Sequence, residues 1–250
     1  MSIQKILTIC ILILCIQLIA CKKKSDSPPT DSEILGNIVK PEIIDEYIYP
    51  IQPGTPEWAA LQSHEEMIEA VKIPDPVLHN ISTWGLVETC FKYPLGGDCL
   101  LMDCPSSWIN DLSTSFNGLN ELFSRTDVSV ILLYNYRYFD FNKYPNWIDW
   151  QYIELMIGCD AFVSKLNNRQ LLYLVSLAIE KSQEQKEYLQ PLLPNSFYIM
   201  ANAMIHAGYK PFIDYCITQN YLQSGTYTYC NGEEKFEEYA KDFIHNLKNN

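Results

Sequence analysis

Residues that begin and end helices recur along the chain from about residue 46, and they limit the fold more than any other feature of the sequence. Thr55 stands before a proline, Ser63 opens the sequence Ser-His-Glu-Glu, and Ser82 precedes an apolar stripe at helical spacing. Further along, Gly208 is placed to end a helix. These closely spaced signals predict an all-α protein built as a packed array of short helices. Such multi-helical folds include irregular α-α superhelices.

Apolar residues three or four positions apart predict the individual helices of this array. The longest clean pattern runs over residues 169–188, with Asn168 as the expected N-cap. A break is expected at Asn117-Gly118, and residues 95–105 are expected to form an irregular connection. The other helices predicted in the C-terminal half cover residues 195–207, 211–218 and 233–247.

One segment carries two conflicting patterns. Val128–Tyr138 has apolar residues at every second position, which is typical of a strand, and also at helical spacing after Asp127. An isolated strand would leave its backbone N–H and C=O groups without partners, and no second convincing strand pattern lies nearby in the sequence. We therefore predict a helix for this segment.

The chain is acidic. Its 250 residues include 30 acidic and 18 basic side chains, which gives a formal net charge of −12 at pH 7. Nucleic-acid binding needs a basic surface that is hard to build from this composition, so we predict no nucleic-acid partner. Because 48% of the residues are hydrophobic, the chain can bury one sizeable core, and we assign residues 46–250 to a single helical domain.

The first 20 residues have the pattern of an export signal. Residues 6–20 are almost wholly apolar and, as a helix, would span about 22 Å, less than the roughly 30 Å hydrocarbon core of a bilayer. The sequence Leu18-Ile19-Ala20-Cys21 follows, and it resembles the lipobox of bacterial lipoproteins. The resemblance implies that the signal peptide 1–20 is cleaved, and that Cys21 carries the lipid that anchors the protein to a membrane.

Residues 21–45 are predicted to connect this anchor to the folded domain. Residues 25–32 are polar and include two prolines, a composition typical of a tether. Position 22 is Lys rather than Asp, which by resemblance to lipoprotein sorting in two-membrane bacteria favours the outer over the inner membrane of the cell envelope. The alternative is an uncleaved membrane anchor with Lys22–Lys24 on the cytoplasmic side.

Several short motifs lie within residues 47–135. They include Gly54-Thr55-Pro56-Glu57-Trp58, Gly85-Leu86-Val87-Glu88-Thr89-Cys90, Tyr93-Pro94-Leu95 and Phe116-Asn117-Gly118-Leu119. Together they resemble the N-terminal half of a family of exported bacterial proteins that has no assigned activity. The resemblance implies a predominantly helical exported protein and assigns no catalytic residue.

The cysteines that follow Cys21 are even in number, which in an exported protein permits disulfides. Cys99 and Cys104 can be joined only by a loop, because a regular helix would place their Cα atoms about 7.5 Å apart. Cys216 and Cys230 enclose an irregular stretch of sequence. We therefore take Cys99–Cys104 and Cys216–Cys230 as candidate disulfides.

The sequence contains no motif for a cofactor, a metal ion or a catalytic nucleophile: CxxC, HExxH, GxSxG, GxGxxG and P-loop patterns are all lacking. We accordingly predict no cofactor, no metal ligand and no catalytic residue, and whether the protein is an enzyme stays open at this point. The alternative function is an exported hydrolase, with a site assembled by folding from His206 and carboxylates distant in the sequence.

The most unusual local composition is the aromatic segment 134–152, in which nine of 19 residues are aromatic. Rings flanked by Asp, Asn and Gln are typical of sugar- or peptide-binding surfaces, but the same rings can fill gaps between short helices. A recognition surface requires Tyr138, Tyr144, Trp147 and Trp150 to be exposed together, and we instead expect Trp147 in the core. The sequence thus predicts a lipid-anchored, non-catalytic binding or interaction module, whose ligand is an unidentified protein, peptide or glycan.

Overall fold

The computed structural model of the protein describes residues 28–140, 143, 146–185, 195–223, 226–227 and 234–246. Within these ranges the regular structure is helical, apart from one antiparallel pair of two-residue strands. This pair joins β1 (Leu222–Gln223) to β2 (Thr226–Tyr227). The predicted all-α fold, a packed array of short helices, is confirmed.

The N-terminal half consists of short helices that start at the predicted caps. The side-chain oxygens of Thr55, Ser63 and Ser82 each accept an N–H from the helical turn that follows. Residues 95–105, expected to be irregular, contain a 3-10 helix instead. The elements of this half are α3 (Pro56–Ala59), α4 (His64–Ala70), α5 (Asp75–Asn80), α6 (Thr83–Phe91), the 3-10 helix η1 (Gly96–Leu101), α7 (Pro105–Ser115), α8 (Asn117–Ser124) and α9 (Val128–Arg137).

Helix α9 resolves the conflicting pattern of residues 128–138 in favour of the helical prediction. The helix satisfies the backbone hydrogen bonds of this segment internally, as an isolated strand could not do. Its buried face includes Ile131 and Leu132, and the buried amide of Asn135 donates to the carbonyl of Ile131 at 2.9 Å. Burial of this face attaches α9 to the core.

The C-terminal half is built around α12 (Asn168–Gln185) and α13 (Ser196–His206), which pack against each other and against α15 (Glu234–Asn246). The cap of α12 is Asn167, one residue before the predicted cap, and its side chain accepts the N–H groups of Arg169 and Gln170. Gly208 has a φ of +69°, which favours glycine, and it follows α13 as predicted. The other helices are α10 (Trp147–Gly158), α11 (Asp160–Val163) and α14 (Lys210–Thr218).

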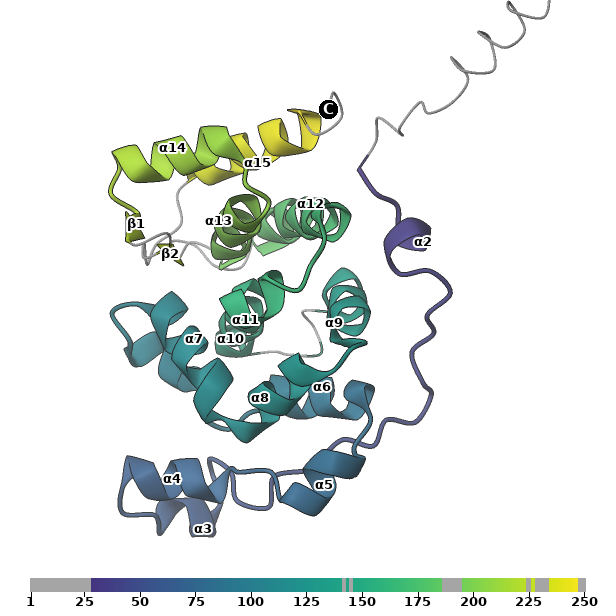
Figure 1. Cartoon of the computed structure of the whole chain (residues 1–250). Coiled ribbons are helices and arrows are strands. Elements are labelled where there is room, and N and C mark those ends of the chain that lie inside the picture. Colours follow the sequence, from purple (N-terminus) through teal and green to yellow (C-terminus); the bar gives the residue numbers. More distant parts are fainter. Residues whose placement is uncertain are drawn as a thin grey trace, which may run out of the picture.

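The helices are stacked approximately in chain order (Figure 1). Helices α3, α4 and α5 lie at one end of the stack, α6 to α13 form its middle, and α14 and α15 lie at the other end. A single cluster of buried apolar side chains connects these layers, with members such as Leu86, Leu132, Ile157 and Ile199. The removal of this apolar surface from water is the main force that holds the short helices together.

Residues 28–50, called the strap below, run along one side of the stack (Figure 1). The strap contains one helical turn, α2 (Asp31–Ile34), and its side chains reach several helices. Lys40 pairs with Glu88 of α6 at 2.6 Å, and Asp45 accepts the backbone N–H of Ser82 at 2.8 Å. The structure therefore differs from the predicted tether of residues 21–45, because the folded unit already includes residue 31 and those that follow it.

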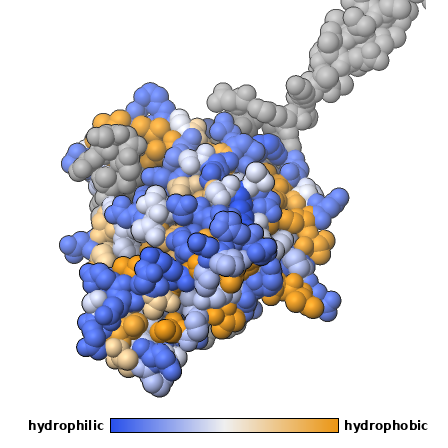
Figure 2. Space-filling model, turned by 60° about the horizontal axis from the view of Figure 1, so that its bottom comes forward, coloured by the Kyte–Doolittle hydropathy of each residue, from blue (hydrophilic) through white to orange (hydrophobic). Residues whose placement is uncertain are grey.

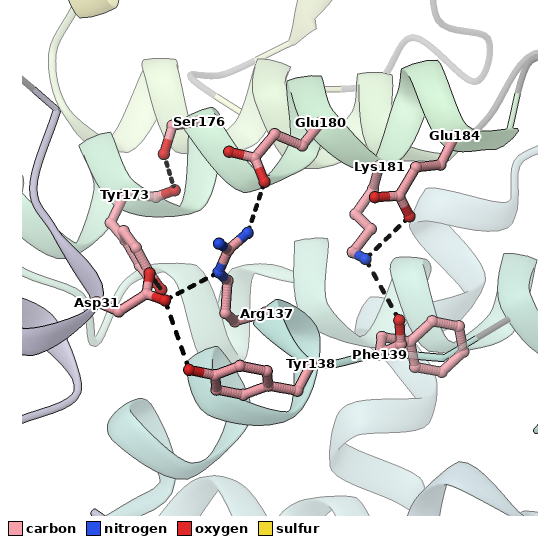
Figure 3. A network of polar contacts seen from close by, with 9 residues as sticks. All are labelled: Asp31, Arg137, Tyr138, Phe139, Tyr173, Ser176, Glu180, Lys181 and Glu184. Carbon is pink, nitrogen blue, oxygen red and sulfur yellow. Dashed lines mark hydrogen bonds and ion pairs between the residues drawn. The ribbon is translucent and has the colours of Figure 1, made fainter. Parts of the chain in front are cut away.

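Asp31 holds one end of the strap to the stack (Figure 3). Its carboxylate accepts the Tyr173 hydroxyl at 2.7 Å and the Nε–H of Arg137 at 3.1 Å, and Arg137 also donates to Glu180 at 2.7 Å. Burial alone would raise the pKa of Asp31, but the bonds from Tyr173 and Arg137 outweigh it and hold that pKa below its ordinary value. One carboxylate thus connects α2 with α9 and α12.

Both candidate disulfides are wrong. Cys99 and Cys216 are buried thiols outside any disulfide bond, so neither Cys99–Cys104 nor Cys216–Cys230 forms. Cys99 lies in η1 and is packed into the core, whereas Cys104 precedes α7 and is disulfide-bonded. Cys230 also lies outside the described residues. Cys90 is a buried thiol, as its place on an apolar stripe indicated.

Candidate functional site

A cavity of about 400 Å³ lies where the end of α6, the 3-10 helix η1 and the start of α10 meet. This volume is in the range of small-ligand pockets, and the wall combines aromatic rings and prolines with amides and charged groups. The residues that line it are Gln52, Pro53, Phe91, Lys92, Tyr93, Pro94, Gly96, Gly97, Asn146, Ile148, Asp149 and Tyr152.

The local sequence creates this hollow by ending one helix and starting the next element beside α10. Helix α6 ends at Phe91, and Pro94 follows it, a residue that cannot continue a helix. At Gly96, which begins η1, a Cβ atom would lie 2.9 Å from the ring of Tyr152. Glycine therefore permits the close approach of η1 to α10, and Tyr152 becomes part of the cavity wall.

Asp149 is the acidic side chain of the cavity wall. It lies in the first turn of α10 and is half-buried, and its carboxylate has no ion pair or hydrogen bond with any other part of the described chain. Burial raises the pKa of Asp149 above its ordinary value. Burial likewise raises the pKa of Asp98 in η1, but that carboxylate has a neighbour, His64, whose Nε2 lies 3.6 Å away. Asp149 thus keeps an uncompensated charge at the cavity.

The positive groups around the cavity already have partners. Lys92 lines it, but its ammonium group pairs with Glu46 of the strap. The N terminus of α10 carries a partial positive charge, yet the Asn146 side chain accepts the N–H of Ile148 at 3.1 Å, and Asp149 stands in the same turn. The charged group of the cavity wall that lacks a partner is therefore the negative one, the Asp149 carboxylate.

Tyr152 contributes to the cavity wall through its ring. Its side chain is buried, and its hydroxyl has no hydrogen-bond partner within the described part of the chain. Its ring centroid lies 6.2 Å from that of Tyr93, and both tyrosines line the cavity. Because that hydroxyl is shielded from solvent, a molecule in the cavity meets the Tyr152 ring and not its oxygen.

The four rings that a recognition surface would require are not exposed together. Trp150 is buried with 6% of its surface exposed, whereas Tyr138 is 57% exposed and Trp147 is 36% exposed. Trp147 was expected in the core, but it is the first residue of α10 and lies at the surface. Tyr144 lies outside the described residues. The aromatic segment 134–152 contributes to the cavity through the start of α10 instead.

His206, the residue named for the alternative hydrolase, does meet a carboxylate. Its Nε2 lies 3.1 Å from Asp160 Oδ1, and the Asn202 amide donates to the same oxygen at 2.8 Å. The bond from His206 lowers the pKa of Asp160 and outweighs the effect of burial. The pair connects α11 and α13, which contribute no residue to the cavity wall.

Across the described ranges no three His, Cys, Asp or Glu side chains are arranged to hold a metal ion. None of the helices in those ranges is both long and apolar enough to cross a bilayer. Residues 6–20 and the predicted lipid-attachment residue Cys21 lie outside the described residues, so their roles stay predictions.

Large apolar side chains are exposed at several separate places. The most exposed include Val39 and Ile43 of the strap and Leu101 at the end of η1. On the face shown in Figure 2, hydrophobic residues occur as small groups separated by hydrophilic ones. This face therefore offers scattered apolar contacts rather than one continuous docking surface.

Comparison with known proteins gives no match: no family model, no curated protein and no solved structure is similar to this chain. A function is therefore inferred from the chemistry of the site.

Sequence reasoning missed the cavity, although part of its signal is visible. Pro94 and the pair Gly96-Gly97 mark a break between helices. Asp149 comes from a much later part of the chain, and no local pattern indicates that it closes the same hollow. Only the packing of η1 against α10 brings these groups together.

Proposed function

We propose that the protein is a lipid-anchored, non-catalytic binding module of the bacterial cell envelope, whose ligand enters the cavity between η1 and α10. Lipid on Cys21 holds the domain at a membrane, with the outer membrane favoured over the inner. The partner is a protein, a peptide or a glycan that places one chemical group in the cavity.

The cavity is the observation that carries the binding part of this proposal. Its wall joins the rings of Tyr93 and Tyr152 to a carboxylate, Asp149, that has no partner among the described residues. Rings supply contact area, and a few placed polar groups supply orientation, which is the usual composition of a ligand site.

With the lipid on Cys21, the strap limits the distance between the folded domain and the membrane. The folded unit begins near residue 28, so the chain from Cys21 to that point can extend at most about 25 Å. A tether that ran to residue 45 would reach several times farther. An anchor at Cys21 therefore places the side of the stack that carries α2 close to the membrane surface.

Lipid labelling tests the anchor. Cells that express the full chain are labelled with an alkyne-bearing fatty acid, and the wild type is compared with Cys21→Ala. We expect label on the wild type and on Cys90→Ala, a control that removes a buried thiol, and none on Cys21→Ala. Equal labelling of wild type and Cys21→Ala would contradict the anchor.

A ligand screen tests the cavity. Small fragments that carry rings, sugars or charged groups are screened by saturation-transfer NMR against the wild type and Gly97→Leu. Gly97 lines the cavity, and a Cβ atom there would lie 3.6 Å from Ile148, an ordinary contact, so a longer side chain fills the space without a clash at its base. Fragments that bind both proteins equally bind elsewhere, and a screen with only such fragments would reject the cavity as the site.

The contact between His206 and Asp160 favours one second candidate function, an exported hydrolase. An imidazole hydrogen-bonded to a carboxylate is the arrangement that orients a general base. We test it by hydrolysis of p-nitrophenyl acetate with the wild type, His206→Ala and the control His79→Ala, which removes an exposed histidine. A rate that falls only in His206→Ala supports the hydrolase, and equal rates in all three proteins reject it.

A further inference from the structure

We propose that the group bound in the cavity is an organic ammonium ion on an apolar stem, held between the Asp149 carboxylate and the rings of Tyr93 and Tyr152. This inference rests on the proposed function, and it names the chemical class of the ligand.

The first argument is charge compensation. The Asp149 carboxylate is half-buried at the cavity and has no counter-ion in the described part of the chain. Withdrawal of a charge from water is unfavourable unless an opposite charge replaces the lost hydration. A bound cation supplies that charge, and the net charge of −12 on the whole protein attracts it from a distance.

The second argument excludes an anionic ligand. The two positive features of the site are Lys92 and the N terminus of α10. Lys92 is paired with Glu46, and Asn146 caps the helix while Asp149 occupies its first turn. An anion would thus meet an uncompensated carboxylate and find no free positive partner.

The third argument separates an organic cation from a metal ion. Hard metal ions need several oxygen ligands, and the side chains of the wall offer one carboxylate and two amides, of which Asn146 already accepts the N–H of Ile148. An ammonium ion binds well to the faces of aromatic rings, and its apolar stem matches the remaining wall.

Such a group has two sources, a lysine side chain of a peptide or a free small amine, and the experiment separates them. The protein, expressed from the full sequence and purified from cell membranes in non-ionic detergent, is titrated with two matched pairs of probes. The first pair is Nα-acetyl-lysine amide and its uncharged counterpart Nα-acetyl-norleucine amide. The second pair is choline and its uncharged isostere 3,3-dimethylbutan-1-ol. Binding is measured by saturation-transfer NMR.

We expect the cation of at least one pair to bind about tenfold more tightly than its neutral counterpart, and the pair that shows this preference identifies the source. Asp149→Asn should abolish the preference, and Asp149→Glu should retain it. The matched control Asp111→Asn removes the same charge from an exposed site on α7 and should leave the preference unchanged. Thermal melts of all variants confirm that they are folded.

Three outcomes would overturn the inference: equal binding within both pairs, no binding of either cation, or a preference that survives Asp149→Asn. If one of these outcomes is found together with a neutral fragment that binds the wild type but not Gly97→Leu, the proposed binding function stands and only the ammonium class is rejected. Failure of every fragment to bind in the cavity would reject both.

Discussion

Glu88 and Glu154 are both buried in the helical core, yet their surroundings differ. Glu88 on α6 is 3% exposed and lies between two lysines, with Lys40 at 2.6 Å and Lys143 at 3.0 Å. Glu154 on α10 is 2% exposed, and its hydrogen-bond donor is the neutral hydroxyl of Tyr136 at 2.9 Å. The first carboxylate has opposite charges beside it, and the second has mainly dipoles.

The two pKa values follow from this difference. Burial would raise the pKa of Glu88, but the bonds and charges of Lys40 and Lys143 outweigh it and leave that pKa below its ordinary value. Burial raises the pKa of Glu154 to about 7, and the hydrogen bond from Tyr136 offsets only part of the effect. One Glu154 oxygen also has no hydrogen-bond partner among the described residues. Hydrogen-bonded lysines thus keep the pKa of buried Glu88 low, whereas hydrogen bonds and the charge of Lys181 only partly offset burial at Glu154. Lys40 of the strap is one of the two lysines at Glu88.

The largest effect should come from removal of both cations around Glu88. In Lys40→Met/Lys143→Met the carboxylate loses both lysines, and we expect the free energy of unfolding at pH 7 to fall by about 3 kcal/mol. This loss is at the lower end of the range for a broken buried ion pair, because both lysines are partly exposed. Urea denaturation measures the loss.

Glu88→Gln added to the same double variant is the control, since it removes the charge that was left buried. Recovery of most of the lost stability in the triple variant would attribute the loss to that charge. A double variant as stable as the wild type would show that the lysines contribute nothing to the folded state.

The opposite result is expected at Glu154. Its pKa is higher in the folded protein than the ordinary value of 4.5, so the folded state holds this proton more tightly. The stability that Glu154 contributes is therefore fully present below pH 4.5 and is lost as pH rises through about 7. Glu154→Gln removes the charge and should raise the free energy of unfolding at pH 8 by about 1–3 kcal/mol, with little change at pH 5.

Urea denaturation at the two pH values checks this outcome, and Glu57→Gln, an exposed glutamate on α3, is the matched control. An equal change at pH 5 and pH 8 would show that Glu154 does not titrate between them.

Helix starts could be predicted because they depend on residues a few positions apart. Thr55, Ser63 and Ser82 form their caps with N–H groups of the next turn, and each was placed correctly from the sequence. The helix over residues 128–137 was predicted because a lone strand has no partner for its backbone. These features depend on local chemistry.

The features that were missed depend on contacts between distant residues. The polar residues 25–32 predict a tether, but Asp31 binds Arg137 and Tyr173, which lie far along the chain. Cys99 was paired with a near neighbour in sequence, although it packs into the core as a thiol. The cavity likewise depends on Asp149 meeting the end of α6.

A smaller effect is expected where the strap is attached near the surface. Arg137→Met removes the bonds to Asp31 and Glu180, but all three side chains are at least one-third exposed, so water replaces much of what is lost. We expect a fall of about 1 kcal/mol or less in the free energy of unfolding. Hydrogen exchange should become faster over residues 31–36 and stay unchanged in α6.

This result would separate the two attachments of the strap. Faster exchange in α6 as well would show that the whole strap detaches as one unit, and the contrast between its exposed and buried attachments would then be wrong.

The smallest loss of stability is expected at Trp147. Its exposure distinguishes it from Trp150, a second tryptophan of the same helix. Trp147 and Trp150 lie three positions apart at the start of α10, the helix that carries Glu154, and are 36% and 6% exposed. Trp147→Ala should lower the free energy of unfolding by about 0.5 kcal/mol, as surface changes do, while the comparison variant Trp150→Ala should lose about 3–5 kcal/mol. Thermal and urea melts of the two variants measure the difference.

Equal losses would place Trp147 in the core and would remove the free surface beside the cavity that a large partner needs. A small loss would leave Trp147 available for such a partner, and retained binding of the ammonium probe in Trp147→Ala would then show that the cavity acts without it.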